Sequence, residues 1–226
     1  MTKVLYVYGS SAGPNGRKYL ALSGQMDFEV LGPELPFPSW KPRSLTELLR
    51  WVGEAVPSYP EACRIIQEAA DEFQPDVIVG SSMGGTVALG VTSPASRVLI
   101  APATRVTLKG ISFPNPLASN RLLARTIILH AEADEVVPFA ASLELLEVAA
   151  KRADPGEAAT MAVIQERLIE AGYTPRHGRL IPIGRNHQCN DPDPADTSNR
   201  DPHPHRAMIT SVRILAGLEP RVSGPR

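Results

Sequence analysis

A serine lies between two glycines in the stretch from Val77 to Gly85, VIVGSSMGG, and this spacing suits nucleophilic chemistry. Gly80-x-Ser82-x-Gly84 is the pattern of a nucleophile elbow, in which a buried strand turns sharply into a helix with the serine at its apex. We predict that the Ser82 hydroxyl projects from the strand end, where the amide of Met83 and the helix dipole can stabilise an oxyanion. The alternative is an ordinary strand-to-helix turn whose glycines permit close packing.

A serine hydroxyl is a poor nucleophile at neutral pH, so it needs a base that takes its proton and a carboxylate that orients the base. Asp134 and His187 are the candidates, because each follows a predicted strand as Ser82 does. Glu132 and Glu135 flank Asp134, which is favoured by its position just before two valines and a proline. The alternative for all three carboxylates is a solvated turn.

His187 competes with the other histidines of the chain. His130 ends an apolar strand and is predicted to be a packed, hydrogen-bonded residue. His177 precedes the last predicted strand, at the wrong end of the sheet. His203 and His205 lie in a segment rich in aspartate and proline, whose spacing matches no metal-ligand motif. We therefore expect no metal and assign the role of base to His187.

The elements that position these residues alternate between strand and helix along the chain. Apolar runs predict strands over residues 3–8, 28–31, 77–79, 97–102, 125–130 and 179–183. Helices are predicted over residues 17–26, 86–89, 140–152, 157–171 and 208–215. Capping boxes at Ser44 and Ser58 predict two further helices. Apolar rather than alternating strands indicate a mostly parallel sheet with helices on both faces, whose active site lies beyond the carboxyl ends of the strands.

The composition of the 226-residue chain fits a single α/β domain over residues 1–226. A net charge of −1 gives no reason to expect nucleic acid or an anionic membrane as a partner. No apolar stretch reaches membrane-spanning length, and the 2 cysteines are no disulfide framework, so we predict a cytoplasmic protein. The glycine-rich loop after the first strand lacks nucleotide-binding spacing. We expect a small-molecule substrate and no cofactor; the oligomeric state stays open.

Five segments of the chain together resemble the α/β-hydrolase superfamily, and more narrowly the short YqiA-like bacterial esterases, which lack a large cap domain. The matching segments are residues 8–11 (YGSS), 33–36 (PELP), 79–85 (VGSSMGG), 134–138 (DEVVP) and 184–187 (GRNH). The resemblance implies an α/β-hydrolase fold with a minimal cap or none. It also implies that Ser82 is the nucleophile, Asp134 the acid and His187 the base, in the chain order of that superfamily. Met83 and Ser10 would supply the oxyanion amides.

The chain departs from that family at two places. The family usually has His-Gly at the end of the first strand, where this chain has Tyr8-Gly9, so Ser11 competes with Ser10 as the second oxyanion donor. The predicted helix over residues 157–171 is an insertion. The leading interpretation is a serine hydrolase that cleaves a small carboxylic ester or thioester. The alternatives are acyl transfer, peptide cleavage or perhydrolysis on the same triad, or a non-catalytic binding protein of the same fold.

Overall fold

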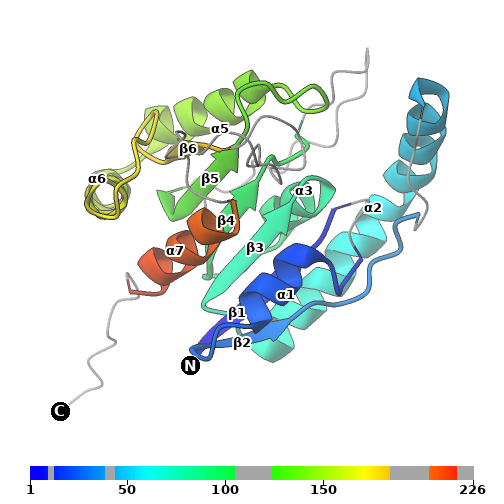
Figure 1. The fold of residues 1–226 in the computed structure, drawn as a ribbon, viewed down its shortest axis with the longest axis horizontal. Helices are drawn as coiled ribbons and strands as arrows, with labels where there is room; N and C mark the ends of the chain where they lie inside the picture. Colours follow the sequence, from blue (N-terminus) through cyan, green and yellow to red (C-terminus); the bar gives the residue numbers. More distant parts are fainter. Residues whose placement is uncertain (10–12, 39–43, 105–123, 184–203, 218–226) are drawn as a thin grey trace, which may run out of the picture.

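The computed structural model describes residues 1–9, 13–38, 44–104, 124–183 and 204–217. Six parallel strands form one sheet in the order β2-β1-β3-β4-β5-β6 (Figure 1). The strands are β1 (Thr2–Val7), β2 (Phe28–Leu31), β3 (Val77–Ser81), β4 (Ser96–Ile100), β5 (Thr126–His130) and β6 (Leu180–Pro182). The parallel sheet of an α/β-hydrolase fold is thus confirmed.

Helices cover both faces of this sheet. They are α1 (Arg17–Ser23), α2 (Leu45–Phe73), α3 (Met83–Gly90), α5 (Phe139–Arg152), α6 (Pro155–Glu170) and α7 (Pro204–Ala216). Because parallel crossovers are right-handed, α1 lies on one face, while α2, α3 and α5 lie on the other. The contacts agree with this, since α1 packs against α7 and α2 packs against α3. The core strands β1, β3, β4 and β5 are therefore buried between two helical layers.

The strand order reverses direction at the neighbouring strands β1 and β3. The chain leaves β1 for the sheet edge at β2, then returns to pair β3 with the other side of β1. The crossovers after β1 and β3 lie on opposite faces, so the carboxyl ends of these two strands form a topological switch point, the place at which α/β proteins generally bind ligands. Tyr8 and Gly9 follow β1 at this point, and Ser82 follows β3.

One sequence-based prediction is wrong: the helices expected at Ser44 and Ser58 are one continuous helix, α2. The Ser44 hydroxyl does cap its start, accepting a hydrogen bond from the Glu47 amide at 3.2 Å. Ser58 lies inside the helix, where its hydroxyl donates to the Glu54 carbonyl. Pro57 removes one helical hydrogen bond, as does a second proline three residues later. Packing outweighs these losses, because one helix face is buried along its length: Trp51, Ala55, Tyr59, Ala62, Ile66 and Ala70.

A fully buried arginine joins α3 to the strand that follows it. The Arg97 guanidinium donates to the carbonyls of Ala88 at 2.9 Å, Val91 at 2.7 Å and Ala95 at 2.7 Å. Helices end with carbonyls that have no partner inside the helix, so a side chain of β4 satisfies the end of α3. Burial lowers the pKa of this guanidinium to about 10.

The predicted insertion over residues 157–171 is α6, which a capping box of Asp154 and Glu157 begins. It packs against α7, and Ile164 and Leu168 are its buried residues. The segment predicted as a crossover or flap, residues 103–124, lies mostly outside the described residues. Within the described part of the chain, no helix is long and apolar enough to cross a membrane.

Candidate active site

Ser82 has a backbone conformation that L-residues rarely adopt. Its φ of 54° and ψ of −120° mark the sharp turn between β3 and α3. The turn is held from both sides, because the Ser82 amide donates to the Ile100 carbonyl at 2.8 Å and the Ser82 carbonyl accepts from the amides of Gly85 and Ala103 at 2.9 and 3.0 Å. Backbone strain of this kind costs roughly 1–3 kcal/mol and persists only where the surroundings enforce it.

The glycines around Ser82 are required by close backbone contacts. A Cβ atom on Gly84 would lie 2.1 Å from the Val7 carbonyl oxygen, which belongs to β1. A Cβ on Gly80 would lie 2.7 Å from the Gly84 carbonyl oxygen. A Cβ on Gly9 would lie 2.8 Å from the Cβ of Ser82, so the chain leaving β1 passes directly beside the serine. The turn therefore exists only where these side chains are absent.

Met83 is the first residue of α3, and it is buried. The first amides of a helix have no partner within the helix and carry the positive end of its dipole. This is the position in which the sequence predicts the first oxyanion amide. The candidates for the second, Ser10 and Ser11, lie outside the described residues.

Tyr8 is buried at the end of β1 and holds the segment that follows β2. Its hydroxyl accepts a hydrogen bond from the Leu35 amide at 2.6 Å and donates to the Leu35 carbonyl at 3.3 Å. Burial raises the pKa of this phenol, and the Glu34 charge adds to the effect. Tyr8 thus has a local role, which is to fix the backbone of Leu35 beside the end of β1.

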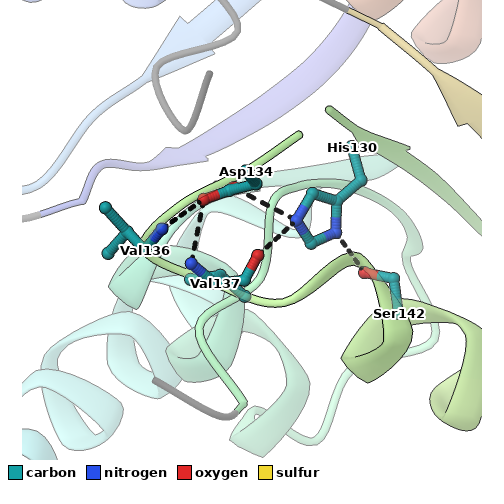
Figure 2. A network of polar contacts seen from close by, with 5 residues as sticks. All are labelled: His130, Asp134, Val136, Val137 and Ser142. Atoms are coloured by element: carbon teal, nitrogen blue, oxygen red, sulfur yellow. Dashed lines mark hydrogen bonds and ion pairs between the residues drawn. The ribbon is translucent and has the colours of Figure 1, made fainter. Parts of the chain in front are cut away.

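Asp134 lies in the turn between β5 and α5, and its side chain is completely buried (Figure 2). Its Oδ1 accepts hydrogen bonds from the amides of Val136 at 2.8 Å and Val137 at 2.9 Å. Its Oδ2 lies 3.1 Å from Nε2 of His130. Donors therefore reach both oxygens, an arrangement that stabilises the ionised carboxylate.

The competing carboxylates in this turn face solvent. Glu132 and Glu135 are exposed, and Glu132 forms an ion pair with Arg176. Asp134 follows β5, which is separated from β3 by one strand, so Ser82 and Asp134 lie at the same edge of the sheet. His187 lies outside the described residues, and its role as the base stays a prediction.

Sequence reasoning expected His130 to be packed and hydrogen-bonded, but missed its partner. The imidazole is buried, with Nδ1 2.7 Å from Oγ of Ser142 and Nε2 3.1 Å from both Asp134 Oδ2 and the Val137 carbonyl oxygen. The usable signal was its spacing: a histidine that ends a strand four residues before a candidate acid is close enough to contact it.

The comparisons with known proteins agree with this architecture. The family model described as "Alpha/beta hydrolase family" matches residues 18–219. The chain belongs to the alpha/beta hydrolase family. A solved structure described as a putative hydrolase of the alpha/beta superfamily, from Xanthomonas campestris, is 18% identical with a TM-score of 0.56, and the match covers 96% of this chain and 98% of that one. This likeness establishes the fold of the chain over nearly its whole length.

Other members of the fold are more distant. A meta-cleavage product hydrolase from Pseudomonas fluorescens is 17% identical, with a TM-score of 0.44 over 65% of this chain and 78% of that one. The esterase domain of a Rhodothermus marinus protein is 18% identical, with a TM-score of 0.35, and the match covers 65% of this chain and 70% of that one. No protein of curated function matches the chain. The finer likeness to YqiA-like esterases stays a prediction.

Proposed function

We propose that this family member is a serine hydrolase that cleaves a small carboxylic ester or thioester through an acyl-enzyme on Ser82. The observation that carries the proposal is the strained turn at Ser82, with φ of 54°, at the topological switch point between β1 and β3. Strain that surrounding contacts enforce at a site of this kind is a sign of function. A turn needed only for packing would be satisfied by glycine, which adopts positive φ at little cost.

The chemistry assigns one role to each residue. Ser82 Oγ attacks the acyl carbon while His187 takes its proton, and the resulting oxyanion is stabilised by the Met83 amide together with the amide of Ser10 or Ser11. His187 then gives the proton to the leaving alcohol or thiol. Water attacks the acyl-enzyme with the same histidine as base, which releases the acid and restores Ser82.

Asp134 orients the base in this scheme. Neighbouring strands lie about 4.8 Å apart, so the axes of β3 and β5 are separated by about 10 Å. An imidazole placed above β4 bridges such a gap between a serine and a carboxylate. Because the Asp134 carboxylate is fixed by two backbone amides, it holds the imidazole in one orientation and stabilises the imidazolium that forms.

The test is labelling of the intact protein with a fluorophosphonate probe, followed by mass spectrometry to locate the adduct. We expect one adduct on Ser82, and its loss in Ser82→Ala and His187→Ala. Both variants should keep the melting temperature of the parent within a few degrees, because neither change creates a clash. A labelled protein then justifies a panel of short-chain esters and thioesters, with added alcohols and amines to detect acyl transfer.

Absence of labelling on folded parent protein contradicts the proposal and favours the non-catalytic binding protein. An adduct on a serine other than Ser82 contradicts the assignment of the nucleophile. The predicted cytoplasmic location forms part of the same proposal and is tested separately, by fractionation of cells that express the chain.

A further inference from the structure

We propose that His130 is a positioning residue, whose Nε2–H bond to Asp134 fixes the orientation and limits the basicity of the acid in the proposed triad. This inference rests on the function proposed above. It starts from the buried chain of contacts in Figure 2, which runs from Ser142 on α5 through His130 at the end of β5 to Asp134.

The hydrogen-bond partners determine the tautomer of His130. Nε2 lies 3.1 Å from Asp134 Oδ2 and 3.1 Å from the Val137 carbonyl oxygen, and both atoms accept hydrogen bonds. Nε2 therefore carries a proton. Nδ1 lies 2.7 Å from the Ser142 hydroxyl, which is able to donate to it. A neutral imidazole satisfies every one of these contacts.

A histidine with a purely structural role would need only its contacts with Val137 and Ser142, because these two contacts already connect β5 to α5. The bond to Asp134 adds something specific. Oδ1 of Asp134 is taken by two backbone amides, so the His130 proton acts on the other oxygen, Oδ2. With three donors around one carboxylate, rotation about its side-chain bonds is prevented. Each donor also withdraws negative charge from the carboxylate, which makes it a weaker partner for an imidazolium.

The surroundings of His130 make this effect strong. Its side chain and that of Asp134 are both fully excluded from solvent, so the interaction is poorly screened. The Phe139 ring from α5 lies edge-on, 5.5 Å from the imidazole centroid to centroid. The Arg176 guanidinium lies 5.9 Å from the centroid of the same phenyl ring and is paired with Glu132. Asp134 is thus the charged group that directly contacts His130 among the described residues.

Two amide substitutions separate positioning from packing. His130→Gln keeps an amide near the Nε2 position and can still donate to Asp134. His130→Asn keeps an amide near the Nδ1 position and falls short of the carboxylate. We expect His130→Asn to lower the rate of fluorophosphonate labelling about 10- to 100-fold, the effect of losing one hydrogen bond to a charged group. His130→Gln should restore most of that rate.

The pH profile provides a second readout that a packing role would not change. Without the His130 donor, Asp134 stabilises the imidazolium of the catalytic base more strongly, so the pKa of that base rises. The labelling rate rises with pH as the base loses its proton, and we call this rise the acidic limb. In His130→Asn the acidic limb should therefore lie at higher pH than in the parent. Ile128→Val, a change in the same buried strand, is the control: it should lower the melting temperature by a few degrees and leave the acidic limb in place.

Ser142→Ala extends the test if His130→Asn does not fold, because it removes only the partner of Nδ1. We expect a smaller fall in the labelling rate than in His130→Asn, and again a shift of the acidic limb to higher pH. The inference is overturned if a folded His130→Asn variant, or failing that Ser142→Ala, matches the parent in both rate and acidic limb. It is overturned together with the proposed function if the parent itself is not labelled at Ser82. A labelled parent with unaffected variants overturns the inference alone.

Discussion

The turn after β3 and the turn after β5 both bring a candidate active-site residue to the same edge of the sheet, by opposite means. The first turn is defined by missing side chains, because Gly9, Gly80 and Gly84 leave the space that the backbone around Ser82 occupies. The second is defined by polar groups, because backbone amides and an imidazole surround the Asp134 carboxylate. One site is specified by steric exclusion and the other by hydrogen bonding.

The difference affects how each turn responds to substitution. A turn that depends on missing side chains cannot form when an atom is added there, because the backbone cannot move out of a packed core without cost. A hydrogen-bonded site can exchange one partner for another and keep its fold while its chemistry changes. We therefore expect changes near Ser82 to act first on folding, and changes near Asp134 to act first on rate.

The largest effect is expected from Gly84→Ala. The added methyl group would lie 2.1 Å from the Val7 carbonyl oxygen and 2.5 Å from that of Tyr8, both of which are backbone atoms of the β1 region. We expect a loss of more than about 4 kcal/mol in the free energy of unfolding, so that little folded protein remains. Circular dichroism during thermal unfolding measures this.

Gly53→Ala is the matched control for that variant. Gly53 lies inside α2 and is exposed, with open space where its Cβ would be. Alanine there should stabilise the protein by about 0.5–1 kcal/mol. If both variants melt near the parent temperature, the turn at Ser82 is not held by steric exclusion and the contrast between the two turns fails.

Asp134→Asn should change rate far more than stability. The asparagine oxygen can still accept from the amides of Val136 and Val137. His130 can accept from the new amide group by changing tautomer, at the cost of its bond to the Val137 carbonyl. The charge that stabilises the imidazolium is lost, so we expect the labelling rate of Ser82 to fall by about 10³- to 10⁴-fold. The melting temperature should fall by only a few degrees.

Glu132→Gln and Glu135→Gln remove the exposed neighbouring charges and should label at nearly the parent rate. If one of these variants lost its labelling rate while Asp134→Asn was labelled fully, the role of acid would belong to that glutamate instead of Asp134.

The smallest effect concerns Tyr8, a polar contact beside the sterically defined turn. Tyr8→Phe removes the hydrogen bonds to Leu35 and should cost about 1 kcal/mol at neutral pH. Because burial raises the pKa of the phenol in the folded state, its contribution is fully present below the usual value of 10.0 and is lost as the pH rises through the raised value. The stability gap between parent and variant should therefore narrow at alkaline pH, as measured by urea unfolding. A constant gap would show that the phenol does not titrate with folding.

The sequence was informative where local backbone requirements decide the structure. The turn at Ser82 and the strand before it depend on glycine spacing and an apolar run, which are visible in the sequence. The contact between His130 and Ser142 depends on how α5 packs against β5, which no local pattern contains. The continuity of α2 was also missed, because Pro57 suggests a break by local rules while burial of one face along the helix maintains it.

The buried guanidinium of Arg97 has a consequence for the order in which the fold opens. Its three carbonyl partners lie 9, 6 and 2 residues away in sequence, so the end of α3, the short loop after it and β4 are tied into one unit. Short loops lose little entropy on closing, and such units are among the last to open in native proteins. In native-state hydrogen exchange, the amides around Ser82 should exchange only with global unfolding. The strained turn at Ser82 is thus expected to belong to a slowly exchanging segment.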